Sequence, residues 1–225
     1  VQIVSERSGK KHVHFGTRNC SVQSPGRQKR IEVAPGFCPD SIAYSFDAKK
    51  VLEDVVEHSL SMAREINYDN VGTWEWIVTP KGDPFLMEVN TRIQVENGVS
   101  AAISRIKGNP DVNLIKEQIR LALGDELGYT QDDITFEGVG IEYRIIPWAG
   151  EIENLRWDDH DWLRMHTHIP KELPYQIPTE FDPNLALAII WGKDLEESKK
   201  RGLEFLDEFV LEGKDRKEVS LKSNL

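Results

Sequence analysis

The spacing of apolar residues along the chain predicts two long amphipathic helices. Between residues 49 and 67, and again between residues 194 and 211, apolar side chains recur every three or four positions and therefore share one face of a helix. Asp194 can cap the second helix, and Glu197, three residues later, would complete a capping box.

A shorter helix and several strands complete the predicted elements. The helix covers residues 112–123 and ends before Gly124, which suits a C-cap position. Apolar segments on either side of Gly-containing turns predict two hairpins, and the later part of the chain predicts further strands. The expected strands are residues 1–4 with 12–15, residues 73–78 with 84–89, residues 138–146, and short antiparallel strands within 147–183. Because strands and helices are mixed without regular alternation, the pattern favours an α+β fold with antiparallel sheet.

Composition narrows the class of protein. The chain has 225 residues, is 39% hydrophobic and carries a formal net charge of -10, which suits a globular protein and disfavours binding to a nucleic acid backbone. No apolar run approaches the roughly 20 residues that a membrane helix requires. Cys20 and Cys38 have neither metal-site spacing nor the number needed for a disulfide framework, so we expect a soluble, cytoplasmic protein with reduced thiols. The strand-like start without an initiator Met indicates a fragment of a longer protein.

The densest run of polar side chains lies between residues 88 and 96. On an extended backbone alternate residues share one face, so Glu88, Asn90, Arg92, Gln94 and Glu96 would point the same way. Carboxylate and amide oxygens suit a hard cation such as Mg²⁺. A guanidinium suits a planar anion, and a carboxylate beside that anion can serve as a general base. The pattern therefore predicts a metal and anion site.

A second carboxylate strengthens the metal interpretation. Glu75 lies on the first strand of the predicted hairpin that also contains Glu88, and antiparallel pairing can bring the two together. Adjacent carboxylates repel each other unless a cation lies between them. The residue pattern alone leaves one alternative open, a solvated strand face whose charges pair across strands.

Four motifs, in this order, resemble those of the biotin carboxylase branch of the ATP-grasp superfamily. They are residues 18–35 with the runs RNCSVQ, QK and EVAP, residues 87–96 (MEVNTRIQVE), residues 140–145 (GIEYRI) and, more loosely, residues 164–182. The run at 87–96 is the most specific. The resemblance implies an α+β fold with two parts, a carboxyl-terminal ATP-grasp lobe (residues 1–124) and the carboxyl-terminal biotin carboxylase subdomain (residues 125–225).

The resemblance also implies roles around ATP. Glu75 and Glu88 would bind Mg²⁺ or Mn²⁺ between the ATP phosphates, with Asn90 assisting. Lys29 would stabilise charge around the transferring phosphoryl group, the usual need in such chemistry. Gln23 would lie near the ribose.

A second group of matching residues would handle bicarbonate and biotin. The resemblance implies that Arg92, Gln94 and the backbone of Val95 hold bicarbonate. Glu96 would deprotonate bicarbonate so that it attacks the γ-phosphate of ATP. Arg144 would stabilise the negative oxygen of the biotin ureido group as its nitrogen becomes a nucleophile.

The activity implied by the resemblance is that of a ligase that forms a C–N bond. The complete enzyme would make carboxyphosphate from bicarbonate and MgATP and carboxylate biotin on a carrier protein. Its partners would be a biotin carboxyl carrier protein or domain, a carboxyltransferase component and further copies of itself, with no nucleic acid or membrane. In this family the glycine-rich lid and the lysines that grip ATP precede the region represented by Val1, so we expect the isolated chain to be inactive.

Several positions depart from the family pattern. Arg27 stands where a neutral acceptor is usual, Asn97-Gly98 replaces His-Pro and is expected to loosen the loop that carries Glu96, and Leu187 replaces a common Lys. These departures favour a rival interpretation, a non-catalytic ATP-grasp-derived scaffold or regulatory module. Another carboxylate-activating ATP-grasp ligase is a third interpretation, and Arg144 argues against it.

Overall fold

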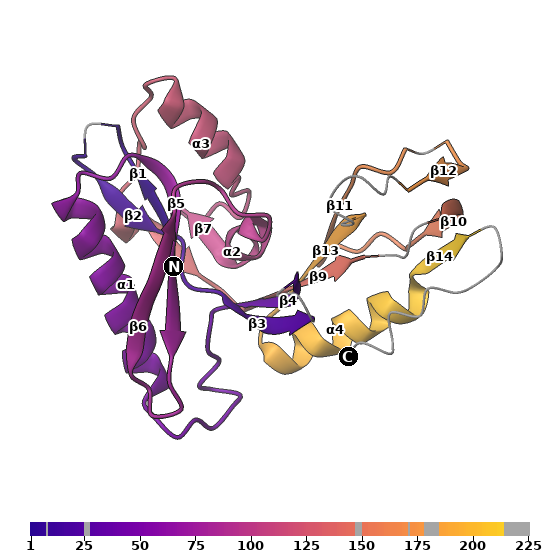
Figure 1. Ribbon diagram of the computed structural model, residues 1–225, viewed down its shortest axis with the longest axis horizontal. Coiled ribbons are helices and arrows are strands. Elements are labelled where there is room, and N and C mark those ends of the chain that lie inside the picture. The colour runs from indigo at the N-terminus through magenta and orange to yellow at the C-terminus, as the bar shows by residue number, and fades with distance from the viewer. Residues whose placement is uncertain (8, 25–27, 147–149, 171, 178–184, 214–225) are drawn as a thin grey trace.

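The computed structural model describes residues 1–7, 9–24, 28–146, 150–170, 172–177 and 185–213. Figure 1 shows two lobes side by side, with strands β3 (Asn19–Ser24) and β4 (Gln28–Ala34) near their junction. Within the described ranges, no helix combines the length and apolar character needed to cross a membrane.

The first lobe is built on a four-stranded antiparallel sheet in the order β2-β1-β5-β6. Its strands are β1 (Gln2–Ser5), β2 (His12–His14), β5 (Asn70–Val78) and β6 (Pro84–Asn90). The pairing of β1 with β2 and of β5 with β6 confirms both predicted hairpins. Helix α1 (Ala48–Glu65), also predicted, packs its Leu60 and Ala63 against Ile3 and Trp74 of the sheet.

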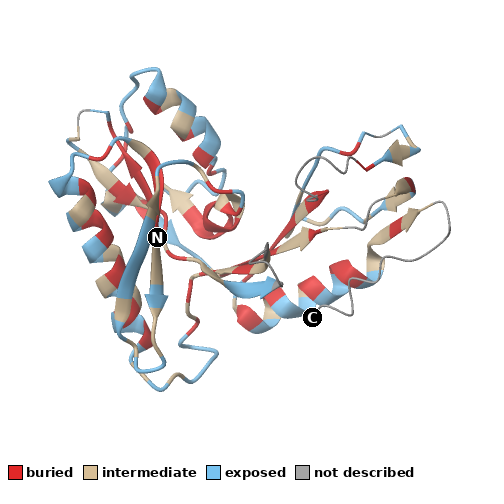
Figure 2. Cartoon of the chain, viewed as in Figure 1, coloured by how far each residue is buried: buried red, intermediate tan, exposed pale blue. Residues whose placement is uncertain are grey.

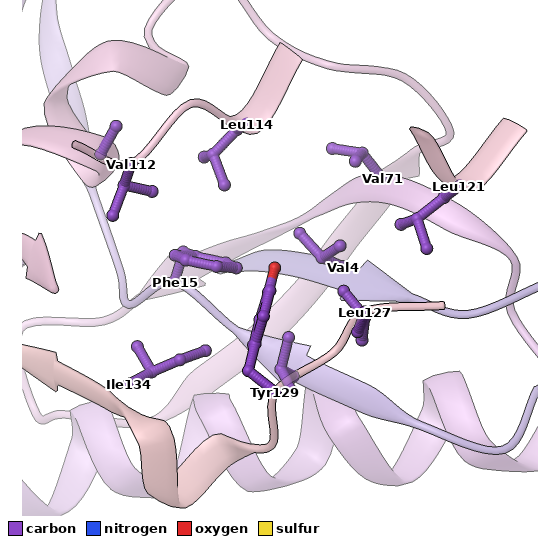
Figure 3. Packing of buried hydrophobic residues seen from close by; sticks show 11 residues of the cluster. Val4, Phe15, Val71, Val112, Leu114, Leu121, Leu127, Tyr129 and Ile134 are labelled. Atoms are coloured by element: carbon purple, nitrogen blue, oxygen red, sulfur yellow. The ribbon is translucent and has the colours of Figure 1, made fainter. Parts of the chain in front are cut away.

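A second apolar cluster, which contains Val4, lies in the same lobe. Figure 3 shows Phe15 and Tyr129 within it, and their rings meet edge to face with centroids 6.3 Å apart. Helix α3 (Leu114–Ala122) adds Leu114 and Leu121 to this cluster. Because the neighbours Ile3 and Val4 point to opposite faces and belong to different clusters, both faces of β1 are covered and the whole strand is buried (Figure 2). Gly124, just beyond α3, has φ +96°, as expected of a C-terminal cap.

The second lobe is built on a five-stranded antiparallel sheet in the order β11-β13-β9-β4-β3. Its remaining strands are β9 (Val139–Ile145), β11 (Leu163–Thr167) and β13 (Ala186–Gly192). Helix α4 (Leu195–Glu208) packs on it through Phe205 and Leu206, which join Ile145 and Ala188 in one apolar cluster. A smaller sheet, in the order β12-β10-β14, contains β10 (Glu151–Arg156), β12 (Tyr175–Gln176) and β14 (Val210–Gly213).

Two details of the predicted last helix are wrong. The helix ends at Glu208, because Phe209 adopts an extended conformation and the chain continues into β14, which pairs with β10. Asp194 does cap the helix, accepting a hydrogen bond of 2.8 Å from the backbone N–H of Glu197. The Glu197 carboxylate, however, accepts from the N–H of Lys193, one residue before the cap, so the capping box is shifted.

Helix α2 (Asn97–Ile103), which the apolar pattern did not predict, lies between the two lobes (Figure 1). Its Ala101 belongs to the Val4 cluster of the first lobe, while Val99 and Ile103 pack with Ala34 of β4 in the second. The chain then forms β7 (Ser104–Ile106), and later a 3₁₀ turn (Gln131–Asp133) leads into β8 (Ile134–Phe136), which pairs with β7. Because α2 begins directly after Glu96 and is buried against both lobes, Glu96 is held at their junction.

The two lobes do not divide the chain at a single point. Strands β3 and β4, early in the sequence, pair into the sheet of the second lobe, while Leu127, Tyr129 and Ile134 pack in the first. The expected division of the sequence into two parts between residues 124 and 125 stays a prediction. The α+β class with antiparallel sheet is confirmed.

Candidate active site

The β5–β6 hairpin places two carboxylates side by side. Glu75 and Glu88 are direct cross-strand partners, as the sequence predicted, at a point where the register between the strands shifts. The side-chain amide of Asn90 donates to both carboxylates, with Nδ2 2.9 Å from Glu75 Oε1 and 3.0 Å from Glu88 Oε1. Lys29 Nζ lies 3.8 Å from the same oxygen of Glu75. Two carboxylates held together in this way form a donor set suited to a divalent cation.

The predicted extended run from Glu88 to Glu96 is wrong beyond Asn90. Strand β6 ends there, and residues 91–96 turn into helix α2 instead of continuing the alternation. The Arg92 side chain is exposed and donates to the carbonyl oxygen of Ile93, 3.1 Å away. Val95 is also exposed, whereas Gln94 and Glu96 are buried. The structure therefore gathers Gln94 and Glu96 into the site, and leaves Arg92 and Val95 on the surface.

Arg18 connects Gln94 to the first lobe. Its guanidinium donates to Gln94 Oε1 at 2.9 Å and to Ser100 Oγ of α2, also at 2.9 Å. A third bond of 3.0 Å reaches Gln2 Oε1 on β1. The amide nitrogen of Gln94 in turn donates to Glu75 Oε1 at 2.6 Å. Gln94 is thereby fixed between a guanidinium and a proposed metal carboxylate, so its orientation is set on both sides.

Glu96 is a buried carboxylate held between two cations. Lys29 Nζ donates to Glu96 Oε1, and Arg144 Nη2 donates to Glu96 Oε2 at 3.0 Å. Burial by itself would raise the pKa of Glu96, but the charge of Arg18 and the hydrogen bond and charge of Lys29 outweigh it and lower the pKa to about 2. Glu96 is therefore ionised at neutral pH.

Arg144 extends from β9 and meets three carboxylates. Besides Glu96, its Nη2 atom lies 2.8 Å from Glu32 Oε1, and its Nε atom lies 3.7 Å from Glu142 Oε1. Glu32 and Glu142 are fully buried partners on the adjacent strands β4 and β9. Within the described ranges, the contacts to these two carboxylates lack hydrogen-bond alignment, and all four of their oxygens remain without a hydrogen bond. The largely covered guanidinium of Arg144, whose side chain is 10% exposed, thus connects Glu96 to a pair of acids behind it.

A cleft of about 320 Å³ opens beside this network. Gln23, Lys29, Glu75, Ile77, Met87 and Gln94 are among its lining residues. Ile77 and Phe85, paired across the hairpin, are 51% and 60% exposed, and Met87 is 54% exposed. These apolar side chains lie along the same hairpin as Glu75 and Glu88. The amide of Gln23 donates to the Cys20 carbonyl oxygen at 3.0 Å, so this predicted ribose contact lines the cleft but turns back on its own strand.

The departures from the family pattern have structural consequences. The Asn97 side chain donates to the carbonyl oxygens of Gln94 and Val95, at 2.9 and 3.4 Å, and ties the loop instead of loosening it. A Cβ atom on Gly98 would lie 2.3 Å from Ile189 Cδ1, so glycine permits the close approach of α2 to β13. Leu187 is the direct cross-strand partner of Arg144. Arg27 lies outside the described residues.

Sequence reasoning missed three residues of the network, namely Arg18, Glu32 and Glu142. A usable signal existed for the two acids, because each is a single charged residue between apolar neighbours in a strand, Ile31-Glu32-Val33 and Ile141-Glu142-Tyr143. Such a residue on a buried strand requires a partner. Arg18 has no comparable local signal.

Comparison with known proteins identifies the family to which the chain belongs. Residues 1–130 match the family described as "Carbamoyl-phosphate synthase L chain, ATP binding domain". Biotin carboxylase 1, chloroplastic, of Populus trichocarpa is 34% identical over 221 residues, which cover 94% of this chain and 38% of the relative.

Solved structures similar to this chain are also biotin carboxylases. The biotin carboxylase domain of a thermophilic 2-oxoglutarate carboxylase bound to bicarbonate superposes with a TM-score of 0.81 and 31% identity, over 94% of this chain and 46% of the other. A biotin carboxylase complex from Campylobacter jejuni superposes with a TM-score of 0.82 and 28% identity, over 95% and 45% of the two chains. The chain spans less than half the length of these relatives. It belongs to the family of the carbamoyl-phosphate synthase large-chain ATP-binding domain, and the relatives it resembles within that family are biotin carboxylases.

Proposed function

We propose that this chain forms the metal-, bicarbonate- and biotin-handling part of an ATP-dependent biotin carboxylase, a ligase that forms a C–N bond. One observation carries the proposal. A single connected network joins a pair of carboxylates (Glu75 and Glu88), a buried carboxylate between cations (Glu96) and an arginine behind it (Arg144). The carboxylate pair, Lys29 and Glu96 are groups of the kind that phosphoryl transfer to bicarbonate requires, and Arg144 is placed to act on the second substrate, biotin.

The hairpin supports the binding of MgATP. Glu75 and Glu88 would hold Mg²⁺, or Mn²⁺, which supplies positive charge next to the ATP phosphates. Asn90 now directs its amide nitrogen at both carboxylates, so it would have to rotate its side chain to offer Oδ1 to the ion. The exposed apolar side chains of Ile77, Phe85 and Met87 offer the base of a nucleotide a surface beside these carboxylates.

Glu96 and its cations support the activation of bicarbonate. The ionised carboxylate can accept a proton, but Arg18, Lys29 and Arg144 now reduce its basicity. A bound anion would draw Lys29 and Arg144 toward itself and so make Glu96 a stronger base. The relative whose title names bound bicarbonate supports this substrate. Arg92 and the backbone of Val95 remain candidates for bicarbonate binding, and Arg92 would have to turn inward from the surface.

Arg144 is the proposed group for biotin, where it would stabilise the developing negative charge on the ureido oxygen. A biotin carboxyl carrier protein or domain and a carboxyltransferase component follow from this role, and one relative is named as a domain of a 2-oxoglutarate carboxylase. A homo-oligomer and a cytoplasmic location belong to the same proposal. The tied Asn97 loop favours it over a non-catalytic scaffold, because the loop that carries Glu96 is well held.

The test uses the complete protein and follows phosphate release from MgATP with bicarbonate and free biotin present or omitted. We expect release to depend on both. Glu88→Gln should lower Mg²⁺-dependent turnover by about 10²-fold, because it removes one of the two carboxylate charges proposed to hold the ion. Glu88 is exposed, so folding should be unaffected, and Glu53→Gln on the exposed side of α1 is the matched control. Turnover that is independent of biotin, or equal in both variants, would contradict the proposal.

A further inference from the structure

Two acids behind the site, Glu32 and Glu142, have no role in the chemistry described so far. They face each other across β4 and β9, two strands that lie next to each other in the sheet of the second lobe. The face they share is the one covered by α2, since Gly140, two residues before Glu142, approaches Val99 of α2. Neither side chain has any exposed surface.

The groups that surround this pair place little positive charge close to the two carboxyl groups. On the other side of Glu142, its partner on β13 is the apolar Ile189. The further titratable groups that face the pair are Arg18 in the loop before β3, Cys20 on β3, Lys29 on β4 and Glu96 at the start of α2. Among the described residues, Arg144 is the one cation within ion-pair distance of either acid. Two buried carboxyl groups therefore share a single guanidinium, which also binds Glu96.

The distances distinguish the two acids. Arg144 lies 2.8 Å from Glu32 but 3.7 Å from Glu142, so Glu32 is the better placed counterion. A second ionised carboxylate beside Glu32 would be buried, repelled by its neighbour and left without a hydrogen bond. Burial, followed by the charge of Glu32, raises the pKa of Glu142 well above its usual range, and burial also raises the pKa of Glu32.

We propose that Glu32 and Glu142 hold one proton between them at neutral pH, mainly on Glu142, and that this pair positions Arg144. The role of Arg144 rests on the proposed function, whereas the protonation of the pair does not. A singly charged pair anchors the guanidinium through Glu32 and adds one negative charge to that of Glu96, where two ionised acids would add two. Arg144 then keeps the charge needed to stabilise an oxyanion in front of it.

The protonation state is tested on the chain itself by thermal unfolding across pH. A carboxyl with a raised folded pKa contributes stability that is present below the unfolded pKa and is lost as pH rises toward the folded pKa. Wild type should therefore lose Tm relative to Glu142→Gln as pH rises above about 4.5, the ordinary value of a glutamate. Glu53→Gln should show no such trend relative to wild type. A difference that is constant, or that moves in favour of wild type, overturns the proposal.

Infrared spectroscopy gives a second measurement that does not depend on how stable the variant is. At neutral pH the wild type should show the C=O stretch of a protonated carboxyl, although exposed acids are ionised. The band should be absent from Glu142→Gln and present in Glu53→Gln. A wild-type spectrum without this band would also overturn the proposal.

The positioning role is tested in the complete protein. Glu142→Gln keeps the charge of Glu32, while Glu32→Gln with Glu142→Gln leaves Arg144 paired with Glu96 alone. For biotin carboxylation, kcat of the double variant should be about tenfold below kcat of Glu142→Gln. The reason is that a small displacement of a catalytic group lowers the rate strongly. KM for MgATP should be the same in the two variants. Equal kcat values in the two variants would reject the positioning role. The infrared and pH measurements would still show whether the pair holds one proton.

Discussion

At the scale of single residues, the charge of Glu96 is maintained by its neighbours and not by solvent. Its side chain is buried, and Lys29, Arg144 and Arg18 supply the positive charge around it. The same contacts make Glu96 both a stabilising group of the fold and a weak base. If the proposed anion site beside Glu96 binds bicarbonate, the basicity of Glu96 is linked to the occupancy of that site.

This link predicts a particular loss of stability in acid. The pKa of Glu96 is lowered from 4.5 to about 2 in the folded chain, so its contribution is present above pH 4.5 and is lost as pH falls toward 2. The size of the contribution is on the order of 3 kcal/mol. In urea unfolding, Glu96→Gln should be less stable than wild type at pH 7, and the gap should narrow at pH values between 4.5 and 2. A gap that widens in acid would show that Glu96 is not held ionised.

The proposed role of Arg144 predicts that a mutation there affects carboxybiotin formation more than bicarbonate-dependent ATP cleavage. Its truncation to Ala would leave Glu32, Glu96 and Glu142 without a shared cation, so loss of folding would obscure the result. Arg144→Lys keeps a positive charge but not the planar guanidinium. In the complete protein it should lower carboxybiotin formation by about tenfold or more and reduce bicarbonate-dependent ATP cleavage much less. Arg156→Lys, on β10, is the matched control, and equal losses of both activities would place Arg144 before the phosphoryl transfer.

From the sequence, the residues of the candidate site could be predicted better than their positions relative to one another. The predicted hairpin correctly brought Glu75 next to Glu88, although the register of the two strands shifts beside Glu75. The alternation expected from Glu88 to Glu96 failed after Asn90, since the backbone there is set by the packing of α2 and not by strand periodicity. For this reason Arg92 was expected beside Gln94 but lies on the surface.

At the scale of elements, helices with a clear apolar face were predictable and short buried ones were not. The helices α1, α3 and α4 each present apolar side chains at helical spacing. Helix α2 has seven residues, begins with Asn97-Gly98 and is buried between two sheets, so it has no polar face to reveal a period. Strand β3 was overlooked because its residues are largely polar and it lies at a sheet edge.

The cap of α4 provides a prediction at this scale. Asp194 accepts a hydrogen bond from the N–H of Glu197, and α4 covers the sheet that carries Arg144 and Glu142. Asp194→Ala should lower the free energy of unfolding by about 1 kcal/mol, while Asp194→Asn should retain most of it, because Asn caps equally well. Lys200→Ala, exposed on the same helix, is a control for helix propensity. Urea unfolding of the four proteins measures the difference, and equal losses for Ala and Asn would show that the charge matters and not the cap.

At the scale of the whole molecule, the site exists because distant segments share one sheet. Strand β4 pairs with β9, more than a hundred residues later in the sequence, and this pairing brings Glu32 next to Glu142, while the packing of α2 on β4 brings Glu96 to Lys29. No local pattern encodes such a pairing, so it could be anticipated only through the resemblance of the motifs. The α2 helix then fixes the two lobes against each other at Glu96.

The same architecture predicts that the 225-residue chain folds alone but does not carboxylate biotin. Each lobe has its own apolar clusters and the two are joined through α2, so we expect one cooperative thermal transition. The chain covers less than half of its relatives, and the family resemblance implies that the elements gripping the triphosphate lie outside it. Because positioning supplies much of the rate of phosphoryl transfer, a site without that grip should be nearly inactive. Purified chain should therefore release no biotin-dependent phosphate above a Glu88→Gln control. Robust release by the chain alone would mean that ATP is held by the cleft lined by Lys29 and Glu75 without further elements.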